Sequence, residues 1–286
     1  RKVLEQYKDT YSFPERNLKS TSIKEKDMYH EFEIFYSELM RYADSNYLLS
    51  EKTMGKKMAT TAFAKSGFKQ SFVSSFYSAL QRVTNRKARL EEYLEKVEDG
   101  NLDGLLDIDY KEEMSDEEIE DDSFEEDSLS KVSKEELKSV SRENFINACT
   151  TELTSIEGII DLGNKIIEDK RKEKKEADPK IVKMIEIVEE TINSSKKPIL
   201  IFAHYLATLD QSFLSLKEAL NRPEVGVGMF KGTEIWYEIE GNRYPADRNQ
   251  IKNLLFNGDI QVLFCSEAAS EGINLQAADM MINMDV

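Results

Sequence analysis

The chain has 286 residues, of which 40% are hydrophobic and 33% are charged, and its formal net charge is -16 at pH 7. This length is enough for two domains and a sizeable buried core. No apolar run approaches the length of a membrane span, and the N-terminus lacks the charged, apolar and small-residue layout of a signal peptide, so we expect no membrane partner.

The chain has two cysteines, Cys149 and Cys265, which lie far apart inside apolar patterns. This pattern predicts buried free thiols, and because a reducing cytoplasm fits it, we expect a cytoplasmic location. The sequence also has two histidines, and none of these four residues stands at the spacing of metal ligands. We therefore expect no metal site.

Most of the negative charge lies in one segment. Residues 107–127 hold 13 acidic residues and one lysine, a net of -12, which leaves only -4 of the total of -16 for the rest of the chain. The acidity of the whole chain therefore says little about its partners.

The first part of the chain predicts helices. Residues 1–22 contain Pro14, which favours an extended entry, and from about Ile23 the pattern turns helical. Apolar residues then recur at steps of three and four in two stripes. The first stripe is Met28, Tyr29, Phe32, Phe35, Tyr36, Leu39 and Met40, and the second is Phe68, Phe72, Phe76 and Leu80 with Val73, Tyr77 and Val83 beside it. We expect both stripes to pack into a helical bundle.

The periodicity is lost over residues 99–130, which are acidic and contain Ser and Gly, so we expect a flexible loop there. Helical spacing resumes at residues 145–160 and again at residues 181–192. Up to about Ser195 the sequence therefore predicts an all-α region.

The character of the sequence changes at Lys196. "KKPILIFAHY" predicts a strand buried on both faces, residues 206–221 a helix, and "VGVGMFKG" a second strand. "PADRNQIKNLLFNG" predicts a helix ending at Gly258, and "IQVLFCS" and "ADMMINMDV" predict two further strands. Such alternation indicates an α/β fold, a parallel sheet with crossover helices, with a domain boundary near residue 196.

Several familiar catalytic and binding patterns are missing or fail. The chain has no Gly-rich phosphate loop, since Gly55-Lys56 lacks the upstream glycine and the following hydroxyl. "DEEI" at residues 116–119 superficially resembles an acidic box that holds a metal ion, but it lacks the apolar strand that such a box needs before it. The glycine spacing of "VGVGMFKG" indicates strand packing rather than a nucleotide loop. Arg82, Arg86 and Arg89 share a helix face that we interpret as an ordinary charged surface. We therefore expect no catalytic residue in this chain.

The segment "VLFCSEAASEGINLQAADMMI" holds the candidate site. Ser266 stands at the carboxyl end of a predicted strand, the edge where open α/β sheets bind ligands. Gly272 permits a turn, and Asn274 offers an amide before the chain returns to the sheet. A tight connection without a ligand would explain Gly272, but not the gathering of hydroxyls, carboxylates and an amide.

This segment resembles motif V of superfamily 2 helicases, most closely that of Swi/Snf-like translocases, whose form is approximately "S-x-x-A-x-E-G-x-N-L-Q-x-A-D". "PILIFAHYLATLD" resembles motif IV of the same lobe. The resemblance is specific over residues 196–286 and loose over residues 1–195. It implies an inter-lobe linker at 1–22, a helical insertion with its acidic loop at 23–195, and a truncated, incomplete RecA-like C-terminal lobe at 196–286.

The resemblance also implies roles for four residues. Ser266 and Ser270 would contact a nucleic-acid phosphate, and Gly272 and Asn274 would border the nucleotide at the lobe interface. In such a motor two lobes use ATP and Mg²⁺ to step along double-stranded DNA, so the expected partners are this duplex and an N-terminal motor lobe upstream of Arg1.

The chain stops at Asp285–Val286, before the family's arginines, and the last strand would leave an open sheet edge. We therefore expect a fragment of an ATP-hydrolysing translocase that neither binds ATP tightly nor hydrolyses it alone. Two alternatives stay open, a non-catalytic module that binds proteins or nucleic acid and an RNA-directed superfamily 2 helicase. The acidic loop is either a solubilising insertion or an internal competitor for the DNA surface.

Overall fold

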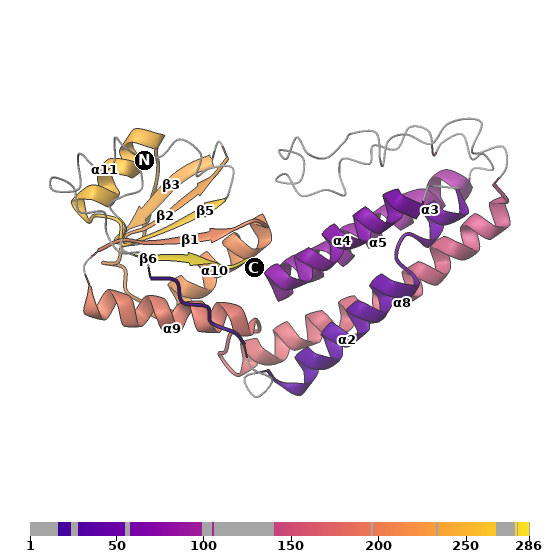
Figure 1. The fold of residues 1–286 in the computed structure, drawn as a ribbon, viewed down its shortest axis with the longest axis horizontal. Coiled ribbons are helices and arrows are strands. Elements are labelled where there is room, and N and C mark those ends of the chain that lie inside the picture. The colour runs from indigo at the N-terminus through magenta and orange to yellow at the C-terminus, as the bar shows by residue number, and fades with distance from the viewer. Residues whose placement is uncertain are drawn as a thin grey trace, which may run out of the picture.

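The computed structural model describes residues 17–23, 28–54, 58–98, 105, 140–195, 197–232, 234–266, 278 and 280–285. An elongated bundle of helices, the helical arm (residues 30–172), meets an α/β lobe (residues 179–285) at one end (Figure 1). Within the described residues, no helix is both long enough and apolar enough to cross a membrane.

The helical arm confirms the prediction of an all-α first region. Its helices are α2 (His30–Ser45), α3 (Leu49–Thr53), α4 (Met58–Ser74), α5 (Phe76–Glu98) and α8 (Arg142–Lys172). Phe35, Phe68, Phe76 and Cys149 lie in one apolar core, as the stripes predict. Tyr36 and Val73 are exceptions, because they lie at the margins of their stripes and are 39% and 44% exposed.

Arg86 corrects the interpretation of the arginines as surface residues. Its side chain is 2% exposed, and its guanidinium contacts Glu51 at 2.6 Å and Glu152 at 2.8 Å, both of which are fully buried. Arg89 is also buried, at 4% exposure. The partners of Arg86 come from α3 and α8, far away in the sequence, so local charge patterning could not reveal the cluster.

The same cluster joins four helices, α2, α3, α5 and α8. Glu152 accepts the backbone N–H groups of Leu48 and Leu49, both at 3.1 Å, and the Tyr42 hydroxyl at 2.7 Å. Burial pushes the pKa of Glu51 upward, but the Arg86 charge and hydrogen bonds outweigh it and hold this pKa below its usual value. The charged cluster thus fixes the start of α3 against α5 and α8.

The lobe has the predicted α/β fold, a mostly parallel six-stranded sheet in the order β4-β3-β2-β5-β1-β6. Its elements are α9 (Pro179–Ser194), β1 (Ile199–Ala203), α10 (Leu206–Leu220), β2 (Val227–Lys231), β3 (Glu234–Ile239), β4 (Asn242–Pro245), α11 (Arg248–Asn257), β5 (Val262–Ser266) and β6 (Met280–Asn283). All four predicted strands are present and parallel. Among the described strands, β6 lies at one edge of the sheet.

The hairpin of β3 and β4 is absent from the prediction. Both strands are antiparallel to their neighbours, and the turn between them places Glu240 and Gly241 at positive φ, 50° and 78°. Two-residue hairpin turns need such angles and usually carry Asn-Gly or Asp-Gly. Glu-Gly is a weaker signal than either pair, so the sequence did not reveal the hairpin. Trp236 of β3 packs against Phe213 at 4.9 Å between ring centroids.

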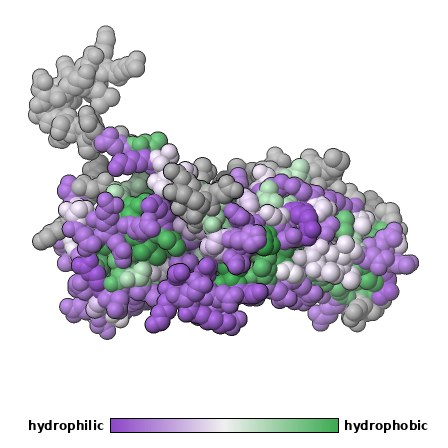
Figure 2. Space-filling view, turned by 90° about the horizontal axis from the view of Figure 1, so that it is seen from below, coloured by the Kyte–Doolittle hydropathy of each residue, from purple (hydrophilic) through white to green (hydrophobic). Residues whose placement is uncertain are grey.

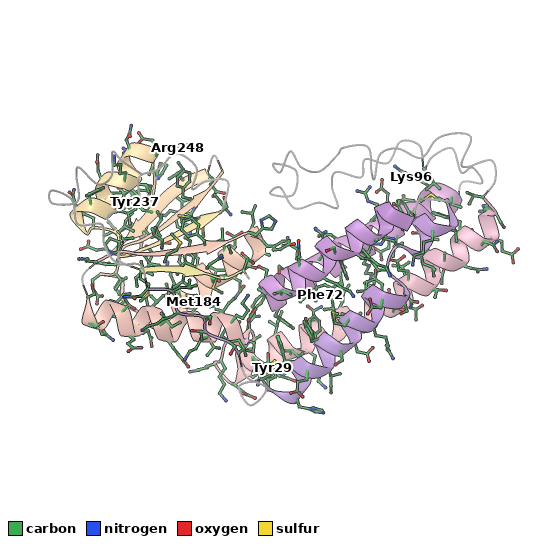
Figure 3. The ribbon with its side chains drawn as sticks, viewed as in Figure 1. Tyr29, Phe72, Lys96, Met184, Tyr237 and Arg248 are labelled. Atoms are coloured by element: carbon green, nitrogen blue, oxygen red, sulfur yellow. The ribbon has the colours of Figure 1, made fainter. Side chains whose placement is uncertain are left out.

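Helices cover both faces of the sheet. α9 and α10 pack on one face and α11 on the other. The sequence places residues 179–194 in the helical region, yet Ile181, Met184 and Val188 of α9 share the core of the sheet (Figure 3 labels Met184). An amphipathic pattern shows that one face is buried but not which element covers it.

The face of the molecule seen in Figure 2 is mainly polar. Figure 2 shows hydrophilic side chains over much of one face, with apolar side chains gathered in separate patches. The most exposed large apolar side chains of the lobe are those of Leu214, Phe256 and Met281, at 56%, 56% and 65%. They belong to α10, α11 and β6. Single exposed apolar side chains of this kind are normal on a soluble protein surface.

Candidate functional site at the carboxyl edge of the sheet

The carboxyl ends of the parallel strands bring Ser266 to the centre of the sheet edge. Ser266 is the last residue of β5, which lies between β2 and β1, and it pairs in register with Ala203 of β1. His204 follows Ala203 directly. Ligands of open α/β sheets bind at this edge. The Ser266 side chain is 1% exposed, so a ligand could reach its hydroxyl only after the surrounding packing changes.

The end of β6 is tied to the end of β1 at the same edge. The Met284 N–H donates to the Phe202 carbonyl at 2.8 Å, and the His204 N–H donates to the Asp285 carboxylate. The second Asp285 oxygen, Oδ1, is buried and has no hydrogen-bond partner within the described part of the chain. Asp285 thus contributes a carboxylate to this edge, a feature that the sequence patterns did not single out.

The other predicted site residues, Ser270, Gly272 and Asn274, lie outside the described residues, as do Gly55-Lys56 and residues 107–127. The structure therefore leaves their predicted roles untested. Of the four, only Ser266 has a described position, and that position is the expected one at the end of a buried parallel strand.

The described residues around the edge offer hydrogen bonding rather than covalent or metal chemistry. Burial raises the pKa of the Cys265 thiol to about 12, so it is protonated at neutral pH and a poor nucleophile. Cys149 is likewise buried, and both cysteines are free thiols, as predicted. Within the described ranges, His, Cys, Asp and Glu side chains form no group of three or more that could hold a metal ion.

Asp178 connects the arm with the lobe, because it bonds the first turn of α5 and that of α9. One of its carboxylate oxygens accepts the N–H of Phe76 and the other that of Lys180, both at 2.7 Å. It therefore satisfies N–H groups in the first turns of α5 and α9 at once. Burial raises its pKa from 3.8 to about 6, against the opposing effects of these two N–H groups and the Lys180 charge.

This pKa predicts a pH dependence of stability. Because the pKa of Asp178 is higher in the folded state (about 6) than its ordinary value of 3.8, the folded protein holds the proton more tightly. The resulting stabilisation is complete below about pH 4 and is lost as the pH rises through 6. We expect the free energy of unfolding of the wild type, minus that of Asp178→Asn, to rise by about 2–3 kcal/mol from pH 7 to pH 4. Urea titrations of both proteins at each pH measure this difference, and a constant or falling difference would contradict the assignment.

A protein-family model matches the part of the sequence that forms the lobe. Residues 180–286 match the model of the helicase conserved C-terminal domain. The comparison with curated proteins gives no match. The matched range contains nearly all of α9 and the whole six-stranded sheet, so it includes the edge at which Ser266 lies. Residues 180–286 thus combine a mostly parallel α/β sheet with a match to the model of the helicase conserved C-terminal domain.

Proposed function

We propose that this lobe is the second motor lobe of an ATP-dependent, Swi/Snf-like translocase that acts on double-stranded DNA. The observation that carries the proposal is the position of Ser266 at the carboxyl end of the central parallel strand, inside the range that matches the helicase domain. The motif V-like sequence that follows Ser266 supports the Swi/Snf side of the superfamily. The complete motor also requires a partner N-terminal lobe, ATP and Mg²⁺.

The proposed division of labour follows the sequence pattern. Ser266 and Ser270 contact nucleic-acid phosphates, which gives grip without reading the sequence. Gly272 and Asn274 border the nucleotide. The resemblance to superfamily 2 motors supports assigning the residues that hold Mg²⁺ to the partner N-terminal lobe. ATP bound between the lobes supplies the phosphoryl-transfer chemistry, and this chain supplies one wall of the cleft.

The duplex contact is tested with Ser266→Ala in the intact protein that contains this chain. The variant is expected to raise the Kd for duplex DNA about fivefold, because one hydrogen bond to a phosphate contributes roughly 1 kcal/mol. The loss should be the same for duplexes of unrelated sequence, because a phosphate contact carries no sequence information. Fluorescence anisotropy with labelled duplexes measures both quantities.

Ser194→Ala is the matched control, since Ser194 is an exposed serine of α9 whose hydroxyl bonds the Glu190 carbonyl of its own helix at 2.9 Å. It should leave the Kd unchanged. An unchanged Kd for Ser266→Ala would contradict the proposed contact. A preference for duplex RNA over duplex DNA would instead favour an RNA-directed motor.

A further inference from the structure

The arm meets the lobe at the break between α4 and α5, where Ser75 separates the two helices. A buried cluster of hydroxyls fills this junction. The Thr208 hydroxyl, in the first turn of α10, lies 2.8 Å from that of Ser74 and 2.7 Å from that of Ser75. All three side chains are at most 1% exposed, so these three hydroxyls are shielded from solvent. Figure 3 shows Phe72 of α4 close to this end of the arm.

Lys180 of α9 completes the junction with three hydrogen bonds. Its ammonium donates to the carbonyls of Val73 at 2.7 Å and Ser74 at 2.9 Å, and also to the Met284 carbonyl. The last carbonyls of a helix lack partners within the helix and carry partial negative charge, so a cation at the end of α4 is favourable. An ammonium has three donor protons, and three carbonyls match that number.

The third of these carbonyls belongs to the candidate site. Met284 follows β6 directly, and its N–H bonds the end of β1. The next residue, Asp285, accepts the His204 N–H. A single ammonium therefore links the last turn of α4 to Met284–Asp285. This short segment follows β6 and is hydrogen-bonded to the end of β1 at the carboxyl edge.

We propose that Lys180 is a positioning residue that couples the orientation of the helical arm to the geometry of the Met284–Asp285 segment at the carboxyl edge. This inference rests on the proposed function for the identity of the ligands, but the coupling itself does not depend on them. Displacement of the arm pulls on the carboxyl edge through Lys180, and rearrangement at the edge displaces the arm. Such coupling is reciprocal. A partner that binds the arm therefore changes the affinity of the carboxyl edge for its ligand, and a ligand at the edge changes the affinity of the arm for its partner.

The coupling is tested by hydrogen exchange in the intact protein, with three variants. Lys180→Met removes the ammonium and keeps most of the stem, and Lys180→Arg keeps a donor. Lys183→Met is the matched control on α9, because Lys183 is exposed and pairs with Glu186 at 2.6 Å. We expect Lys180→Met to accelerate exchange of the His204 and Met284 amides about tenfold, with the central β5 amides unchanged, since local opening exposes only the amides near it. Lys180→Arg should restore much of the protection, and Lys183→Met should have no effect.

Acceleration of all lobe amides in parallel would show a loss of global stability only and would overturn the proposal. Unchanged exchange at His204 and Met284 would overturn it too. Because exchange needs no nucleic acid, its result is independent of the motor function. The second measurement is the duplex concentration that half-saturates ATP hydrolysis: it should shift in Lys180→Met and recover in Lys180→Arg. A shift in neither exchange nor hydrolysis would overturn the proposed coupling.

Discussion

Arg86→Met is expected to lower the free energy of unfolding of the helical arm by about 3–5 kcal/mol, because it leaves buried carboxylates without their counter-charge. Glu51 and Glu152 are at most 1% exposed and accept four hydrogen bonds from the Arg86 guanidinium, which donates a fifth to the Ser50 hydroxyl. Glu152 also holds the start of α3, so its displacement would loosen that helix. Urea denaturation followed by far-UV circular dichroism measures the loss.

Arg41→Met is the matched control, since Arg41 is 75% exposed and pairs with Glu38 on the surface of α2. It should cost less than about 1 kcal/mol. The triple variant Arg86→Met, Glu51→Gln, Glu152→Gln should recover part of the loss, because it removes the unpaired charges as well. A cost for Arg86→Met no greater than that of Arg41→Met would contradict the buried network.

Gly226→Ala is expected to destabilise the lobe by more than about 3 kcal/mol, because no room exists for a methyl group. A Cβ at this position would lie 1.9 Å from the carbonyl oxygen of Asp259, a backbone atom that can move only with its chain. The Gly226 carbonyl and N–H also bond the Gln261 N–H and side chain, at 2.8 Å and 2.7 Å. The change therefore forces β2 and β5 apart where the two strands begin.

Gly158→Ala is the control, because nothing lies within 4 Å of a Cβ there and Gly158 lies inside α8. It should raise stability by about 0.5–1 kcal/mol through the helix propensity of alanine. The chain has one tryptophan, Trp236 of β3, so its fluorescence reports on the unfolding of the lobe. Equal stability of Gly226→Ala and the wild type would show that the strand ends are farther apart than described.

The elements that the sequence predicts well are those with a strong local pattern. The stripes of the arm repeat every three or four residues, and the four parallel strands are continuous apolar runs between polar segments. The glycines of "VGVGMFKG" indicated close packing of a strand. In the structure, Gly226 and Gly228 both lie close to Ile260, just before β5. The helix ending at Gly258 begins with a capping box at Asp247 and ends with a positive φ of 79° at Gly258. The residue types at both ends, an Asp before the helix and a Gly after it, are typical helix boundaries in a sequence.

The features that the sequence did not reveal depend on distant partners. Arg86 looked like a surface residue because Glu51 and Glu152 are 35 and 66 positions away. Lys180 lies in a run of charged residues, and its three carbonyl partners are more than 100 positions away. For the candidate site, the pattern located Ser266 at the sheet edge, whereas the contribution of Asp285 follows only from the pairing of β6 with β1.

The most direct test of the motor assignment is ATP hydrolysis, with and without duplex DNA, by a protein in which this chain is joined to the proposed partner lobe. The account predicts hydrolysis that duplex DNA stimulates more than duplex RNA does and that Asn274→Ala abolishes, because we propose that Asn274 borders the nucleotide. Binding of duplex DNA without hydrolysis of ATP under any of these conditions would contradict it and would leave a lobe that only binds.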